Sequence, residues 1–316
     1  MERVRLRLSE YRLRLKFTRG GRISSYLGAT LRGGFGAALR RISCVQPTAS
    51  SCSQCILHTG CPYGYIFETP TPRGQSMMKL NGHAPHPMVL RPPLSIPSPL
   101  EPGMEVEIAV LLFGHATEYF PYVLFAFERL GEAGLGVERV PFRIERVVIG
   151  SNGEQVFSSE TPGPVPLLPA EVAEASIGEP REGFLRVEFL TPMRLRVEKR
   201  KALRRPDFGA LVYAALRRLE LLVRVHEAGE FTVRAPEIVG MAREAELVED
   251  ETRWHDVVRY SQRQGRTMPL GGFVGSALFS GKVLGLTSVL SLAGRVHVGR
   301  GTAFGNGHFR VEEVGQ

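Results

Sequence analysis

The sequence predicts an α+β protein of two tandem ferredoxin-like (RRM-type) domains, with a cysteine-rich metal-binding insertion in the first. Each half of the chain opens with a segment of alternating apolar residues, typical of a strand, and a helix follows it. These strands are too few and too alternating for a doubly wound parallel sheet. All four cysteines lie within eighteen positions of the first half. We therefore expect domains at residues 1–150 and 184–316, joined by a linker at 151–183 that is rich in Pro, Gly and Ser.

The first half is expected to begin with a strand over residues 4–17. Its apolar residues alternate with arginines, and a break at residues 9–10 shifts the alternation, as a bulge or turn does. A helix follows from Ser24 and Ser25, which supply an N-cap, to about Arg41, although three glycines weaken it. The remaining elements expected in this half are an irregular proline-rich span (62–102), a strand (104–114), a helix (121–131) and a strand (142–150).

The second half is expected to repeat this order. Residues 184–197 form a strand or hairpin, and residues 208–228 form a strongly apolar helix. Residues 272–284 are apolar without a periodicity that distinguishes helix from strand. A glycine-rich segment then leads to a last alternating strand, so we expect it before or within a terminal hairpin.

The glycine-rich segment, residues 294–308, is the first candidate for a binding site. Glycine is costly inside regular structure, so repeated glycines indicate a tight turn or a close approach to a ligand such as a phosphate. The segment lacks the Lys followed by Ser or Thr of a P-loop, and it does not lie between a strand and a helix, as a dinucleotide-binding loop does. A polyanion such as RNA beside Arg300 and His308 is one interpretation, and a glycine-rich turn without a ligand is the other.

The charge distribution favours a nucleic-acid partner. The net charge is +8, and residues 1–41 contain eleven Arg or Lys against two Glu, while residues 257–311 contain seven basic residues and no acid. Two basic ends are typical of a nucleic-acid footprint. The amino terminus lacks the pattern of a signal peptide, and no apolar run is long enough to span a bilayer, so we expect a cytoplasmic protein without a membrane partner.

The four cysteines, Cys44, Cys52, Cys55 and Cys61, predict one metal site. Cys-x-x-Cys presents two thiolates to one tetrahedral ion, and the other two cysteines complete the set. A structural zinc ion is favoured over an iron–sulfur cluster and over cysteines that bind no metal. A zinc-dependent nuclease is set aside, because four thiolates leave no open coordination position.

Four segments resemble the CRISPR-associated endoribonucleases of the RAMP superfamily that process precursor CRISPR RNA, and in particular a branch with four cysteines. The segments are VHVGRGTAFGNGHF near the end, ATLRGGFGAALRR with the following cysteines and CPYGYIFE, LLFGHATEYFPYVLFAFERLGEAGLG, and RYSQRQGRTMPLGGFVG. They lie between residues 29 and 309 and so cover most of the chain.

The resemblance implies an activity and partners. It implies two ferredoxin-like folds that hold CRISPR repeat RNA across a basic face, and cleavage in which a ribose 2′-hydroxyl attacks the adjacent phosphate, without a cofactor, leaving a 2′,3′-cyclic phosphate and a 5′-hydroxyl. The alternative is a non-catalytic RAMP subunit that grips guide RNA together with other CRISPR-associated effector subunits. This alternative is kept because such nucleases use a histidine near the first helix, and this chain has none before His58.

The candidate catalytic residues are Tyr26, His255 and His308. Tyr26 lies where the resemblance implies a catalytic group, Asp256 is placed to orient His255, and His308 flanks the glycines; ordinary packed or surface side chains are the alternative for each. Guanidinium groups bind phosphates bidentately, which favours the arginines of residues 259–266, unless they form a solvated helix face. The full set expected to bind RNA is Arg22, Arg32, Arg40, Arg259, Arg263, Arg266, Lys282, Arg300, Gly301, Gly305 and Gly307.

Overall fold

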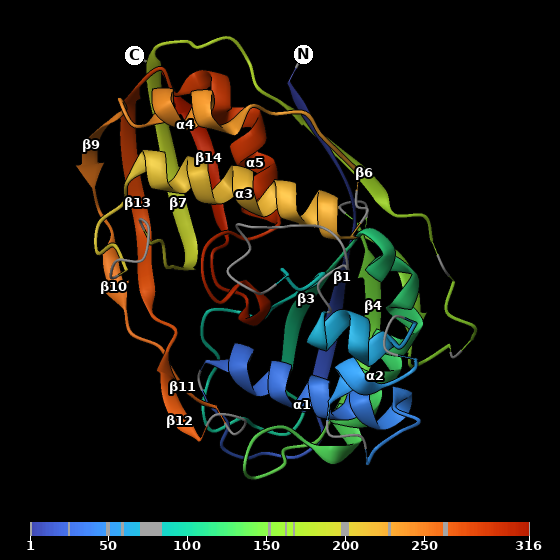
Figure 1. The fold of residues 1–316 in the computed structure, drawn as a ribbon. Coiled ribbons are helices and arrows are strands. Elements are labelled where there is room, and N and C mark those ends of the chain that lie inside the picture. Colours follow the sequence, from blue (N-terminus) through green and yellow to red (C-terminus); the bar gives the residue numbers. More distant parts are fainter. Residues whose placement is uncertain are drawn as a thin grey trace. The chain divides into compact units, whose positions relative to one another are not determined.

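The computed structural model (Figure 1) divides the chain into two compact units. The N-terminal unit comprises Arg7–Glu171 and Arg224–Ala228, and the C-terminal unit comprises Met1–Leu6, Val172–Val223 and Gly229–Gln316. The structure describes residues 2–24, 26–48, 51–57, 60–69, 84–150, 153–161, 163–166, 168–196, 202–226, 229–261 and 265–315.

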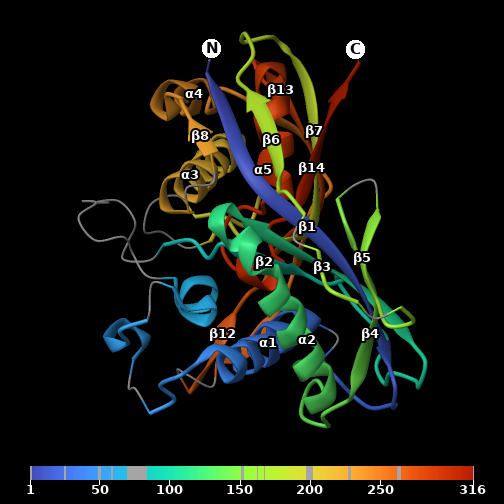
Figure 2. The same cartoon turned by 90° about the vertical axis from the view of Figure 1, so that its right-hand side faces the viewer.

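The sheet of the N-terminal unit has the ferredoxin-like strand order. Its strands β1 (Arg3–Phe17), β2 (Met88–Arg91), β3 (Glu105–Phe113) and β4 (Phe142–Ile149) are arranged β2-β3-β1-β4, and each neighbouring pair is antiparallel. Helix α1 (Leu27–Ser43) follows β1, and helix α2 (Phe120–Ala133) connects β3 to β4; both lie on one face of the sheet (Figure 2). The chain order β-α-β-β-α-β with this pairing defines the fold.

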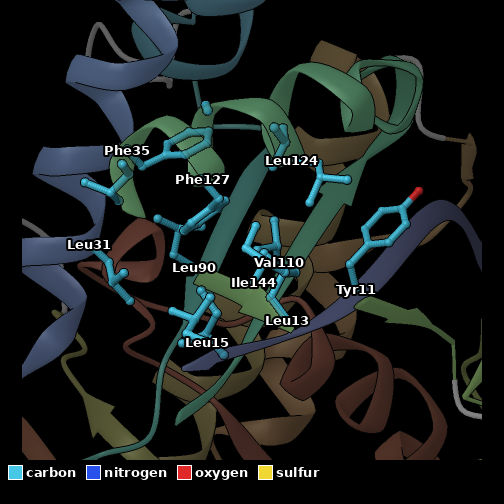
Figure 3. Close-up of a cluster of buried hydrophobic side chains, with 14 of the residues drawn as sticks. Tyr11, Leu13, Leu15, Leu31, Phe35, Leu90, Val110, Leu124, Phe127 and Ile144 are labelled. Atoms are coloured by element: carbon cyan, nitrogen blue, oxygen red, sulfur yellow. The ribbon is translucent and has the colours of Figure 1, made fainter. Parts of the chain in front are cut away.

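The core of this unit lies between the sheet and the two helices (Figure 3). Alternate residues of a strand point to the same face, so Leu13 and Leu15 of β1 face the helices together with Val110 of β3. Phe35 of α1 meets Phe127 of α2, with ring centroids 5.0 Å apart. Burial of these side chains is the main source of stability in such a layer.

The glycines that weaken α1 as an isolated helix are required where it packs. A Cβ atom on Gly34 would lie 2.5 Å from Leu130 of α2, and one on Gly36 would lie 2.3 Å from the Phe67 ring. No side-chain hydrogen bond caps the first turn of α1, whose N-cap is Tyr26. Of the two serines expected to cap it, Ser25 lies outside the described residues.

The C-terminal unit repeats the same arrangement. Strands β7 (Gly183–Met193), β10 (Arg253–His255), β13 (Gly272–Gly281) and β14 (Phe309–Val314) are ordered β10-β13-β7-β14, and β9 (Glu246–Asp250) also pairs with β13. Helices α3 (Phe208–His226) and α5 (Thr287–Arg295) cover one face of this sheet (Figure 1). The expected fold of two ferredoxin-like domains is therefore confirmed, and residues 272–281 are a strand.

Several shorter elements complete the two units. They are the 3-10 turns Cys52–Gln54, Gly114–Tyr119, Leu284–Leu286 and Thr302–Phe304, a π-helix at Gly64–Glu68, helix α4 (Ala235–Ala242), and strands β5 (Glu154–Ser158), β6 (Glu171–Ser176), β8 (Gly229–Phe231), β11 (Val258–Ser261) and β12 (Arg266–Pro269). None of the helices in the described part of the chain is both long and apolar enough to cross a membrane.

Two expectations from the sequence differ from the structure. The predicted linker, 151–183, contains strands β5 and β6, which pair with β4 and β1, because short alternating segments lie between its prolines and glycines. The predicted terminal hairpin is wrong, because β14 pairs with β7 rather than with a neighbouring segment. The predicted shift in β1 is visible as two consecutive buried residues, Leu8 and Ser9.

The packing of Gly307 gives a first prediction. Its φ is +82°, and an added Cβ would lie 1.8 Å from the carbonyl oxygen of Val298. We expect Gly307→Ala to lower the free energy of unfolding by about 3 kcal/mol or more in urea titrations. The added Cβ would clash with a backbone carbonyl, which cannot move aside as a flexible side chain can. The control is Gly240→Ala in α4, where no atom lies within 4 Å of the added Cβ. This change should leave the free energy of unfolding unchanged or raise it by about 1 kcal/mol. Equal stability changes in the two variants would contradict this interpretation.

Candidate functional site

The glycine-rich segment connects α5 to β14 and is folded against the end of β7. The amide of Arg300 donates to the Arg194 carbonyl at 3.1 Å, and the amide of Gly307 donates to the Pro192 carbonyl at 3.1 Å. The segment can take this path because its glycines adopt left-handed backbone angles, with φ of 89°, 80°, 90° and 82° at Gly299, Gly301, Gly305 and Gly307. The glycines are thus explained by the fold of the segment itself.

Two stacked histidines lie on this segment. His297 is fully buried, and its Nδ1 lies 3.0 Å from the Asn306 carbonyl, so Nδ1 carries the proton. The His308 ring stacks on it with centroids 5.0 Å apart, and the His308 amide donates to the Thr191 hydroxyl at 2.9 Å. His308 is half-buried. Its ring is therefore held in one orientation while part of it faces solvent.

Four arginines form a positive cluster in the C-terminal unit, and we call Arg194, Arg196, Arg204 and Arg300 the arginine cluster. Burial lowers the pKa of Arg194, and the charges of the other three lower it further. The Arg194 guanidinium donates to the Gly271 carbonyl at 3.0 Å, while the other three side chains are exposed. Like charges held together raise the energy of the free protein, and a bound polyanion relieves this repulsion.

Aromatic side chains accompany these cations. The guanidinium of Arg204 lies 3.9 Å from the Trp254 ring centroid, and that of Arg194 lies 5.9 Å from it. The Arg259 guanidinium lies 4.5 Å from the Phe304 ring centroid, which brings β11 to the glycine-rich segment. Arginines interleaved with aromatic rings are typical of surfaces that bind single-stranded nucleic acid by phosphate contacts and base stacking.

The other residues predicted for this unit have different surroundings. His255, on β10, is half-buried, and Asp256 accepts a hydrogen bond from the Trp254 indole at 2.7 Å, a role other than the expected orientation of His255. Lys282 shares a surface depression with Glu182, Glu244 and Glu246, whose carboxylates offset its charge and make it a poor phosphate ligand.

Two further predictions for this unit concern positions that are described only in part or not at all. Arg266 lies on β12, where its backbone is described and its side chain is not, and Arg263 lies outside the described residues.

In the N-terminal unit, the predicted residues lie around α1. Tyr26 is half-buried at the N-cap, and Arg22 and Arg40 are exposed. Arg32 is only 7% exposed, with its guanidinium 4.0 Å from the Phe67 ring centroid and its Nη2 3.0 Å from Nε2 of His86. The burial of Arg32 favours a structural role over a contact with RNA.

The basic character of residues 1–41 is partly offset by acids from elsewhere in the chain. Within the C-terminal unit, Arg5 pairs with Glu174 at 2.8 Å. Within the N-terminal unit, Arg14 and Lys16 both approach Glu105, at 3.6 and 3.7 Å. Exposed pairs of this kind contribute little to stability, but they reduce the charge that strand β1 presents to a polyanion.

Two sets of residues in the structure were not predicted from the sequence. Three members of the arginine cluster lie in the basic run 194–205, which holds seven Arg or Lys in twelve positions, so a signal was present. The second set centres on His226, only 2% exposed, whose Nε2 donates to the Pro85 carbonyl at 2.6 Å and whose Nδ1 accepts from the Tyr65 hydroxyl at 3.0 Å. Tyr65 also contacts the rings of His115 and Tyr119.

The four cysteines line one cavity of about 340 Å³ in the N-terminal unit. They are partly buried and form no disulfide. Burial raises the pKa of the Cys52 thiol, and the charge of Glu68 raises it further. Across the described ranges, no three His, Cys, Asp or Glu side chains lie close enough together to hold a metal ion.

Comparisons with known proteins cover both units. A family model described as an N-terminal domain, AF_1859_N, matches residues 6–169, more than half of the chain, and the model of the CRISPR-associated endoribonuclease Cas6 matches residues 187–309. A search of curated protein sequences gave no significant match.

Among solved structures, Thermus thermophilus Cas6 (TTHB231) superposes with a TM-score of 0.55 at 16% identity, covering 97% of this chain and 99% of that one. A product complex of Cas6 (TTHB231) gives a TM-score of 0.54 at 16% identity with the same coverage. At this identity the superpositions establish a shared fold.

The buried Tyr65–His226 pair gives a second prediction. Tyr65→Phe should lower the free energy of unfolding by about 1–3 kcal/mol, because it leaves the buried Nδ1 of His226 without its donor. In a His226→Phe background the same change should cost much less, giving a coupling of about 1 kcal/mol in a double-mutant cycle measured by urea unfolding. Tyr122→Phe, at a ring that is 46% exposed, is the matched control and should change stability by less than about 0.5 kcal/mol. Additive effects of the Tyr65 and His226 substitutions would rule out the coupling.

Proposed function

We propose that this chain, which belongs to the AF_1859_N family of N-terminal domains through residues 6–169 and matches the model of the CRISPR-associated endoribonuclease Cas6 over residues 187–309, cleaves CRISPR repeat RNA in precursor transcripts. The observation that carries the proposal is the arginine cluster beside the glycine-rich segment, and both lie within the span matched by the endoribonuclease model. The Cas6 protein (TTHB231) that shares this fold has been solved in a complex with its product.

The proposed reaction uses the RNA as its own nucleophile. A base removes the proton of a ribose 2′-hydroxyl, and the 2′-oxygen forms a bond to the adjacent phosphorus. The bond from phosphorus to the 5′-oxygen breaks, and an acid donates a proton to that oxygen. The products are a 2′,3′-cyclic phosphate and a 5′-hydroxyl. Because no water molecule has to be activated, the step needs no catalytic metal ion.

The C-terminal unit holds groups suited to these roles. Arg300, Arg196 and Arg204 are exposed cations that stabilise the added charge of a pentacoordinate phosphorane. His308, held by its stacking on His297, is the favoured base, and His255 is the second candidate. Tyr26, which belongs to the N-terminal unit, is the third candidate, and its phenolic hydroxyl has a proton to donate as the acid.

A second candidate function is a guide-RNA grip without catalysis, acting with other CRISPR-associated effector subunits. It is favoured by one feature of the sequence, the absence of any histidine before His58 and therefore from the first helix. Both functions use the same basic surface, and they differ only in whether bound RNA is cut.

Cleavage is tested with the purified protein and its own end-labelled repeat RNA in excess EDTA. We expect a single cut that disappears when the nucleotide 5′ to the scissile phosphate carries a 2′-deoxy group. Cleavage of the deoxy substrate, or activity that is lost in EDTA and restored by magnesium, would contradict the 2′-hydroxyl mechanism. Tight binding without a cut would establish the second function.

The base is located by substitution. His308→Ala should lower the rate constant of cleavage by about 10²–10⁴-fold with little change in RNA affinity, because a general base acts mainly in the transition state. His255→Ala and Tyr26→Phe are tested in parallel. His115→Ala, at a half-exposed side chain paired with Glu118, is the matched control and should cleave normally. An unchanged rate in His308→Ala would remove this residue from the mechanism.

The arginine cluster is tested through the salt dependence of RNA binding. Each phosphate contact contributes about 0.7 to the slope of log K against log salt for single-stranded RNA. Arg204→Ala and Arg300→Ala should each weaken RNA binding and lower the magnitude of the slope by about 0.7, the value of one phosphate contact. The affinities are measured by filter binding between about 50 and 300 mM salt. Arg129→Ala on α2, whose guanidinium already pairs with Glu132 at 2.7 Å, should leave the slope unchanged. A slope that does not respond to the cluster would place the RNA elsewhere.

A further inference from the structure

The segment from Cys44 to Cys61, which we call the insertion, lies between α1 and the π-helix Gly64–Glu68. Its described residues contain one three-residue turn, Cys52–Gln54, in which the Cys55 amide donates to the Cys52 carbonyl at 3.1 Å. Its apolar side chains are mostly turned outward, with Val45 68% and Ile56 83% exposed. Hydrophobic burial therefore does little to hold this insertion in place.

The cysteines are less exposed than these apolar side chains. Each of the four is partly buried, and all four line one cavity of about 340 Å³ with Arg40 and Tyr63, to which Val45 and Ile56 also contribute. The Cys61 amide donates to the Leu57 carbonyl at 2.9 Å, and its thiol lies 3.9 Å from the Ser43 carbonyl. The fold therefore gathers all four thiols of the chain around one cavity.

We propose that Cys44, Cys52, Cys55 and Cys61 bind one structural zinc ion. The two cysteines around the turn supply one pair of thiolates, and those at the two ends of the insertion supply the other, which satisfies a tetrahedral ion. No three of these side chains lie close enough together to share an ion. Binding therefore requires the side chains to rotate inward until each sulfur lies about 2.3 Å from the ion.

The charge around the cavity suits an all-thiolate site. Zinc with four thiolates carries a net charge of about −2, and such sites are stabilised by nearby cations and amide donors. Arg40, in the last turn of α1, lines the cavity and supplies a positive charge. Four thiolates fill the coordination shell, so the ion stabilises the fold and binds no substrate.

The ion connects this insertion to the interior of the N-terminal unit. Phe67, in the π-helix after Cys61, packs on Gly36 of α1 and under the Arg32 guanidinium. Holding Cys44 and Cys61 on one ion fixes the end of α1 against that π-helix. This inference concerns stability and metal content, and it holds whether or not the protein cuts RNA.

The test begins with the metal content of protein purified without a metal-binding tag and under anaerobic conditions, so that an iron–sulfur cluster is not lost. We expect about one zinc per chain, no visible absorption and no iron. Iron with absorption near 400 nm, or no stoichiometric metal at all, would overturn the proposal. The chain has four cysteines in total, so a thiol titration after denaturation without reductant should find all four reduced, and disulfides would also overturn it.

Variants assign the site to its residues. The double variant Cys52→Ser with Cys55→Ser should lose the zinc, whereas Ile56→Ser in the same loop should keep it, because that side chain is 83% exposed and supplies no thiolate. Zinc retained in the double variant would overturn the proposal.

Folding is followed separately on the wild-type protein. Removing the metal with a chelator should lower Tm by about 5–10 °C, and zinc but not magnesium should restore it. A Tm that does not change as zinc leaves would overturn the structural role.

Discussion

The C-terminal unit depends on one steric constraint, the close approach of the glycine-rich segment to neighbouring backbone. The positions that a Cβ would take on Gly294 and Gly307 are 2.2 and 1.8 Å from carbonyl oxygens of Phe309 and Val298. Only glycine permits both contacts. Because the segment lies this close, its amides bond to Arg194 and Pro192 at the end of β7, which places Arg300 near Arg194. The same constraint aligns His308 on His297.

Among the described residues, the arginines of the two units differ in how closely acids approach them. Strand β1 is rich in arginine, yet several of its cations meet carboxylates, and Lys282 lies among three glutamates. The arginine cluster differs, because burial and the neighbouring arginine charges together lower the pKa of Arg194. A surface of this kind favours an anion, and the rings of Trp254 and Phe304 add the means to stack bases.

In the N-terminal unit, helix α1 also depends on glycines for its close packing. Gly34 and Gly36 let it approach α2 and the Phe67 ring, while Arg32 covers that ring from the same helix. Its last turn carries Arg40 to the cysteine cavity, and its first residue follows Tyr26. Glycine lowers the helix propensity of α1, but it lets neighbouring side chains approach the helix closely, and this packing is why the glycines are tolerated in its interior.

The sequence by itself determined the features that depend on the order of neighbouring residues. These are the strands and helices of each half and the two ferredoxin-like folds that follow from their order along the chain. The grouping of the cysteines is a third such feature, because their spacing is short. Alternation and helical periodicity are properties of neighbouring residues, so β3, β4, β7 and α3 were predicted to within a few residues. Tertiary structure alone decided which charges are paired and which side chains meet. Glu174 meets Arg5, and His226 bonds to Tyr65, 161 positions away. Such contacts arise from strand pairing and helix packing between distant segments, and the residues themselves carry no local signal of their partners.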